Sequence, residues 1–159
     1  MYKQILFALI PVLGFLLIGS SISAATLPSS QSGTISSIQN GPDGKPEWKV
    51  SGTWDLRNLK SNSATFNASF DMMKLDGLSK HKHTITATIP SANFIVAGKS
   101  SIRAYSGTAT ISMKEGPVSH VPIVLRLSSD GNINIMPDPA KTKGHFGNTP
   151  IQGKTNMYS

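Results

Sequence analysis

Apolar and polar residues alternate one by one along most of the chain beyond residue 34. Such alternation predicts half-buried β-strands, because successive side chains of a strand point to opposite faces of the sheet. No segment after the N-terminal region has a convincing helical period, and no internal repeat is visible. The pattern predicts strands over residues 35–39, 48–56, 64–73, 81–89, 93–98, 102–113 and 121–128, followed by short strands around Ile133 and Ile151.

Turn-forming residues separate these segments. Examples are the sequences NGPDGKPE, LDGLSK, KEGP and SSDGN, in which Gly, Pro, Asp and Asn favour tight turns. Gly107 interrupts the long segment 102–113 and is expected to mark a bulge. Eight or nine short strands predict an all-β domain, either an antiparallel β-sandwich or a small barrel of about eight strands. The alternation alone leaves both architectures open.

The N-terminal residues have the organisation of a secretory signal peptide. A short positive segment ending at Lys3 precedes an apolar run over 5–18, and small residues fill 19–25. The apolar run is shorter than the roughly 20 residues of a membrane-spanning helix, although a retained N-terminal anchor is the alternative. We therefore expect a signal peptide at 1–25, a flexible Ser- and Pro-containing arm at 26–34, and a single β-domain at 35–159. The protein is expected to be exported, to the extracellular medium, a periplasm-like space or the cell surface.

Composition narrows the classes of partner. The chain has no cysteine, so its β-domain must be stabilised by an ordinary core, with or without a metal. The net charge is +7, but the basic residues are scattered and aromatic residues make up only 7%. Without a basic surface that carries stacked aromatics, nucleic acid is not expected as a partner. The positive charge favours solubility, or attraction to an acidic cell-surface polymer.

The motifs of common catalytic sites are absent from the sequence. There is no Gly-x-Ser-x-Gly nucleophile elbow, no His-Glu-x-x-His pair and no phosphate-binding glycine loop. The chain is therefore predicted to bind rather than to catalyse. A catalytic activity would depend on a bound metal whose open position activates water or dioxygen.

Two histidines give the strongest indication of a site. His81 and His83 lie two residues apart at the start of a predicted strand, on the face that continues as Ile85, Ala87 and Ile89. Both imidazoles therefore point toward the edge of the core, where they need partners or water. Two such imidazoles can reach one ion at about 2.0–2.1 Å.

A third ligand must come from elsewhere in the chain. His145 lies in the glycine-containing segment KGHFGNTP, and the sequence predicts a copper or zinc site formed by His81, His83 and His145. Other candidate ligands remain open, namely Asp76, Asp138, His120 and the methionines Met72, Met73, Met113 and Met136. A strand end whose histidines only meet solvent is the simpler alternative.

Three further features concern the surface and the core. Asn67 begins the sequence NAS on the predicted outer face and is a candidate glycosylation site. Exposed strand edges and the Ser-rich arm suggest a second function, a structural or adhesive cell-surface protein that assembles by self-association. A barrel that binds an apolar ligand is a third possibility, with Trp48, Trp54, Phe66 and Phe70 lining its cavity.

The ordered segments FNASFDM, HKHTIT, GTATISMKEGPV and DPAKTKGHFGNTPIQG resemble a group of small exported β-rich proteins of ammonia-oxidising archaea. The resemblance spans roughly residues 48–153 and is most specific in its final segment. It implies an extracytoplasmic β-domain, and the group has no assigned function to transfer. Because such organisms rely heavily on copper, the resemblance makes copper the first metal to test.

Overall fold

The computed structural model describes residues 29–90, 94–97 and 102–156, and it is all-β over these ranges. The expected signal peptide at 1–25 lies outside the described residues. Within them there is no helix, and hence none with the length and apolar character needed to cross a membrane.

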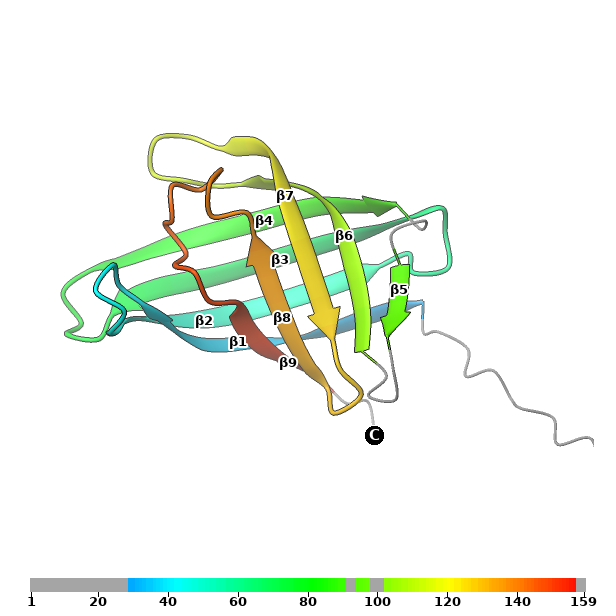
Figure 1. The fold of residues 1–159 in the computed structure, drawn as a ribbon, viewed down its shortest axis with the longest axis horizontal. Coiled ribbons are helices and arrows are strands. Elements are labelled where there is room, and N and C mark those ends of the chain that lie inside the picture. The colour runs from blue at the N-terminus through cyan, green and yellow to red at the C-terminus, as the bar shows by residue number, and fades with distance from the viewer. Residues whose placement is uncertain (1–28, 91–93, 98–101, 157–159) are drawn as a thin grey trace, which may run out of the picture.

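The described residues form nine strands, which are arranged in one antiparallel sheet (Figure 1). They are β1 (Ser30–Asn40), β2 (Pro46–Arg57), β3 (Ser63–Lys74), β4 (Lys80–Pro90), β5 (Phe94–Ala97), β6 (Ile102–Ile111), β7 (Val118–Leu127), β8 (Asn132–Pro137) and β9 (Ile151–Thr155). The order of neighbours is β4-β3-β2-β1-β9-β8-β7-β6-β5, with an additional pairing between β4 and β6.

The pairing of β4 with β6 closes eight of these strands into a barrel. Ile85 to Thr88 of β4 pair with Ile111 to Thr108 of β6, and at the other junction β1 pairs with β9. The sandwich that the alternation left open is therefore wrong, because hydrogen bonds join the two halves of the sheet on both sides. The prediction of a small barrel of about eight strands is confirmed. The short strand β5 pairs with the other half of β6.

The inner face of the barrel is the apolar face that the sequence predicts. Along β3, the residues Ala64, Phe66, Ala68, Phe70 and Met72 are all buried, and their neighbours in the sequence are not. Phe66 and Phe70 are at most 1% exposed and Trp54 is 2% exposed, and all three belong to the single core cluster. These rings pack against other core side chains, so the structure gives no support to the idea that they line a ligand cavity.

Two details of the strands differ from the sequence-based predictions. β1 begins at Ser30, so residues 30–34, which were expected in a flexible arm, are paired with β2. The irregularity in β6 lies between Ala109 and Ile111 rather than at Gly107. A Cβ atom at Gly107 would lie 2.2 Å from the carbonyl oxygen of Thr88, so this glycine allows β6 to approach β4 closely.

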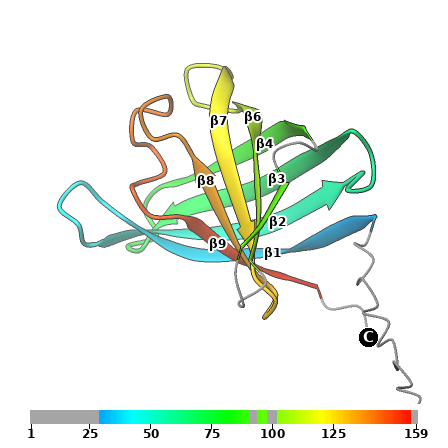
Figure 2. The same cartoon turned by 45° about the vertical axis from the view of Figure 1, so that its right-hand side comes forward.

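The antiparallel order places four connections at one end of the barrel (Figures 1 and 2). These are the turns β1–β2, β3–β4 and β6–β7, and the long β8–β9 loop of residues 138–150. The strands separate at this end, because β1 pairs with β9 only from Gly33 to Ile35. The β8–β9 loop lies against the exposed edge of β1, where Thr149 donates a hydrogen bond to Gln39 and the Gln39 amide donates to the Pro150 carbonyl. We call this end of the molecule the loop end.

Candidate metal centre

His81 and His83 are the second and fourth residues of β4, and they lie at the loop end. His83 is buried, with 2% of its surface exposed, whereas His81 is partly exposed. Their partners on β3 are Met72 and Phe70, both on the core face. The predicted inward orientation of the two imidazoles is therefore confirmed, and it follows from the two-residue repeat of a strand.

His145 is brought to the same place by the β8–β9 loop. The loop is held by a series of turns, in which Gly144 N–H donates to Pro139, His145 N–H to Thr142 and Gly147 N–H to Gly144. Gly144 and Gly147 have φ angles of 68° and 71°, a region that favours glycine. The tight backbone directs His145 across the open end of the barrel, toward the start of β4.

The three imidazoles converge on a single point. The Nε2 atom of His145 lies 3.0 Å from Nε2 of His83 and 3.2 Å from Nε2 of His81. One nitrogen atom from each of the three histidines lies within 4.8 Å of the others. Nitrogen atoms that bind one tetrahedral zinc ion at 2.0–2.1 Å are about 3.3–3.4 Å apart. Two of the three separations, those from His145, are close to this spacing, and the third is no more than 4.8 Å.

A backbone carbonyl fixes the tautomer of His83. The Nδ1–H group of His83 donates a hydrogen bond of 2.6 Å to the carbonyl oxygen of Ser112. Ser112 is itself held to β4, because its N–H donates to the Thr84 carbonyl and its hydroxyl accepts from the Thr84 N–H. With its proton on Nδ1, the neutral ring presents a lone pair on Nε2. A carbonyl partner of this kind commonly orients a metal-binding histidine.

Only one of the two short contacts of His145 Nε2 can be an ordinary hydrogen bond between neutral rings. If His145 carries its proton on Nε2, that proton must be shared between His83 and His81. If it does not, its lone pair faces the lone pair of His83 at 3.0 Å. A cation at the centre of the three Nε2 atoms attracts all three lone pairs at once.

Burial also keeps two of the rings in the neutral form that binds metals. The pKa of His83 is lowered from its ordinary value, mainly by burial, although its hydrogen bond to Ser112 opposes the shift. The pKa of His145 is lowered by burial and then by the neighbouring His83 and His81. An additional proton is therefore disfavoured on these two rings, and the neutral imidazole is the form that can bind a metal ion.

These shifts predict that the metal-free protein loses stability in mild acid. Below a pH of about 6.5, the unfolded chain takes up protons on these histidines more readily than the folded chain does. The free energy of unfolding should therefore decrease as the pH falls from 7.5 to 5.5, a range above the usual pKa of carboxyl groups. Urea unfolding at a series of pH values measures this decrease. The exposed His120 supplies a control, because a His120→Gln variant should keep the same slope, and a free energy that stays level would contradict the prediction.

Aromatic rings surround the imidazoles and limit their contact with water. The Trp48 ring lies edge-on to His81 with ring centres 5.1 Å apart, and the Phe146 ring lies 5.0 Å from His83. Phe70 lies 5.7 Å from His83 and packs against Phe146. Apolar surroundings strengthen the interaction between a cation and its ligands, because there is little water to compete with them.

Among the other candidate ligands, His120 and the two acids lie elsewhere or have other roles, whereas Met72 lies opposite His81 with its side chain buried in the core. His120 is exposed and adopts a φ angle of 57° at the start of β7. The carboxylates of Asp76 and Asp138 accept hydrogen bonds from the backbone of their own turns, at Leu78 and Ala140. Among the described residues, His81, His83 and His145 form the one group of histidines and acids with metal-binding spacing.

Asn67 lies in the middle of β3 and is partly buried on the outer face of the barrel. Its side-chain amide donates a hydrogen bond to Asp55, which also forms an ion pair with Arg57. Glycosylation at this position stays a prediction.

Two contributors to the site were not identified from the sequence. The Ser112 carbonyl is a backbone group, so the identity of the residue carries no signal for it. Phe146 follows His145 directly and is 2% exposed. A large apolar residue inside a glycine-rich loop is the one signal that indicates a loop folded onto the core.

Comparisons of the chain with models of protein families, with curated proteins and with solved structures found no match. The functional conclusion therefore rests on the geometry of the histidine cluster.

Proposed function

We propose that this protein is an exported β-barrel that binds one transition-metal ion through His81, His83 and His145 and has no catalytic role of its own. The observation that carries the proposal is the meeting of three Nε2 atoms, with two separations of 3.0 and 3.2 Å. These atoms come from a strand and from a loop 62 residues further along the chain. The fold thus holds the ligands in place before any ion binds.

The ligand set favours copper or zinc. Three neutral imidazoles suit both metals, and no carboxylate that would favour magnesium or calcium belongs to the cluster. Three protein ligands leave a fourth position of a tetrahedral ion open. The resemblance to exported proteins of copper-dependent organisms makes copper the first metal to test. The affinity order of divalent metals also places copper above zinc.

Export is proposed from the sequence of residues 1–25, and the barrel is compatible with it. Ser30 pairs with Arg57 and Thr155 pairs with Gly33, both near the end of the barrel opposite the histidines, so the site lies at the end remote from both described termini. A barrel attached to a surface through its N-terminal arm would present the histidines outward.

Assembly through strand edges has less support as an alternative function. Closure of the barrel gives each of its eight strands a neighbour on both sides over part of its length. Within the described part of the chain, β5 is the strand that pairs with a single neighbour, and it has four residues.

Metal binding should stabilise the folded protein. An ion that binds only the folded state raises the free energy of unfolding by about 2.7 kcal/mol when its free concentration is 100 times the Kd. We expect zinc or copper to raise the melting temperature of the metal-free protein, with a stoichiometry of one ion per chain by mass spectrometry of the metal. Magnesium at the same concentration serves as the control. Equal melting curves with zinc, copper and magnesium would contradict the proposed function.

A further inference from the structure

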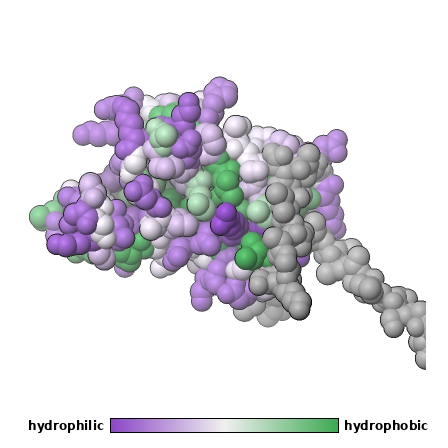
Figure 3. Space-filling view, in the orientation of Figure 1, coloured by the Kyte–Doolittle hydropathy of each residue, from purple (hydrophilic) through white to green (hydrophobic). Residues whose placement is uncertain are grey.

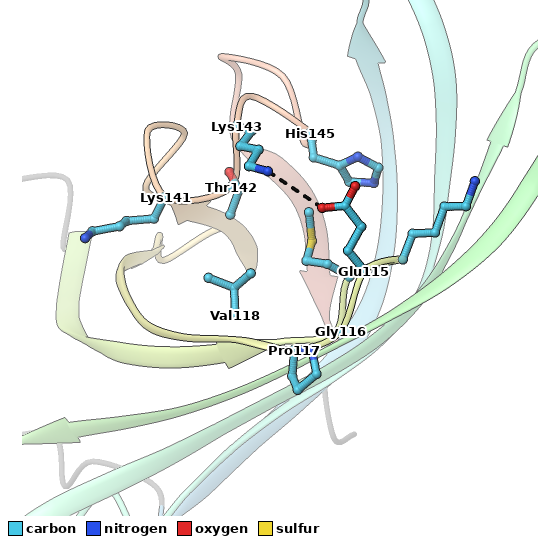
Figure 4. A pocket seen from close by; sticks show the side chains of 10 residues that line it. Glu115, Gly116, Pro117, Val118, Lys141, Thr142, Lys143 and His145 are labelled. Carbon is cyan, nitrogen blue, oxygen red and sulfur yellow. Dashed lines mark ion pairs between the residues drawn. The ribbon is translucent and has the colours of Figure 1, made fainter.

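A pocket of about 440 Å³ opens beside His145, between the β6–β7 turn and the β8–β9 loop (Figure 4). This volume is in the range of sites for small molecules. Its walls come from two segments, residues 113–118 and residues 141–145. Because His145 belongs to both the pocket wall and the metal centre, a ligand in this pocket lies next to the proposed ion.

The pocket has an apolar wall and a positive rim. Met113 and Val118 pack against the core of the barrel, and Pro117 lies between them in the chain. Lys114, Lys141 and Lys143 also line the pocket, against the single acid Glu115. The molecular surface on this side is mostly hydrophilic, and its hydrophobic areas are small (Figure 3).

The Glu115 carboxylate occupies a position in the pocket, next to Lys143, that another anionic group could take. This carboxylate and the Lys143 ammonium group point toward each other from opposite sides of the pocket, 3.7 Å apart, with the His145 ring beside them (Figure 4). Both side chains are 86% exposed, so the ion pair contributes little stability and is easily exchanged. A carboxylate from outside can therefore replace that of Glu115 next to Lys143.

We propose that this pocket binds a small organic carboxylate, with its anionic group at Lys143 and its apolar body against Met113 and Val118. The part of the proposal that concerns the metal rests on the proposed function. Because His145 lines the pocket and also belongs to the histidine cluster, a carboxylate bound here would be a candidate for a further ligand of the ion. The preference for an anion itself derives from the lysines and does not need the ion.

Benzoate and benzamide provide a matched pair of probes, because they have the same shape and differ in charge. Isothermal titration of the full chain, metal-free and zinc-loaded, should show benzoate binding about two- to fivefold more tightly than benzamide, the effect of one ion pair with an exposed lysine. Zinc should increase the affinity for benzoate further and leave that for benzamide unchanged. Equal benzoate affinity with and without zinc would overturn the contact with the ion.

Substitutions of the charged residues at the pocket rim test whether Lys143 causes the preference for benzoate. Lys143→Gln should remove most of the preference for benzoate, and Glu115→Gln should increase the affinity because the competing carboxylate is gone. Lys60→Gln, in the β2–β3 turn at the opposite end of the barrel, should change nothing. A protein that binds benzoate and benzamide equally, or a Lys143→Gln variant with unchanged preference, would overturn the pocket.

Zinc affinity, measured in the same variants, keeps the two proposals apart. Glu115→Gln should bind zinc as the parent does, and weaker zinc binding would overturn the pocket by showing that Glu115 is itself a ligand. If zinc does not bind at all but the benzoate preference persists, the metal function fails and the anion pocket stands. If zinc binds but benzoate is not preferred over benzamide, the anion pocket fails and the metal function stands.

Discussion

Replacing His145 with alanine is expected to lower the affinity for zinc or copper by more than about 100-fold, because it removes one of three ligands. Loss of a group that only orients a ligand commonly costs 10–100-fold, so loss of a ligand should cost more. His145 lies in a loop and is partly exposed, so the variant should remain folded. Equilibrium dialysis with a competing chelator measures the change. His81→Ala and His83→Ala should give losses of the same order.

The matched control is His120→Ala. This histidine is exposed and does not belong to the cluster, so its loss should leave metal affinity unchanged. If all four alanine variants bind the metal equally well, the ion is bound elsewhere or only adventitiously.

Phe146→Ala is expected to affect both stability and the site. The ring is 2% exposed and belongs to the core cluster, and truncation of such a side chain costs about 3–5 kcal/mol. Phe146 also anchors the loop that presents His145, because its ring contacts both Phe70 and His83. We therefore expect a lower free energy of unfolding by urea and a weaker affinity for zinc.

Phe66→Ala separates these two effects. Phe66 is fully buried and packs near Trp54, away from the histidines. Its truncation should cost a similar amount of stability but leave zinc affinity intact once the protein is folded. A Phe146→Leu variant, which keeps much of the apolar volume, should stay folded and show intermediate zinc affinity. Equal zinc affinity in the Phe66 and Phe146 variants would show that the loop does not need this anchor.

Local alternation predicted strands such as β3, β4 and β7 well because each of them has one buried face and one more exposed face. The inward direction of His81 and His83 follows from the same rule. Both residues are an even number of positions from the buried Ile85 and Ile89, so they lie on the same face of β4. The long β1 was underestimated because Ser and Gly, which fill its first positions, have low intrinsic preference for strands.

Closure of the barrel could not be read from the sequence. It depends on the pairing of β4 with β6, whose paired residues are 20 to 26 positions apart, and on the close approach that Gly107 permits. A glycine inside a strand indicates either a bulge or a close approach of another backbone, so the sequence around Gly107 does not distinguish the two. The separation of the strands at the loop end, which leaves room for the β8–β9 loop, is likewise a property of the whole barrel.

The third ligand was proposed from residue type, and only the structure brings it to the other two. Nothing in the spacing of 62 residues between His83 and His145 distinguishes this histidine from the other candidates. The turns around Gly144 and Gly147 and the burial of Phe146 determine where the loop lies. The carbonyl of Ser112 completes the site through the backbone alone.

X-ray absorption at the zinc edge of the fully loaded protein examines most directly the coordination that this account requires. Three imidazole nitrogens at about 2.0–2.1 Å are expected, with one further light atom from water or an added carboxylate. The His145→Ala protein, loaded to the same extent at high zinc concentration, should lose one of the three imidazole signals. A first shell made of oxygen atoms, or one identical in the parent and in the His145→Ala protein, would contradict the metal centre.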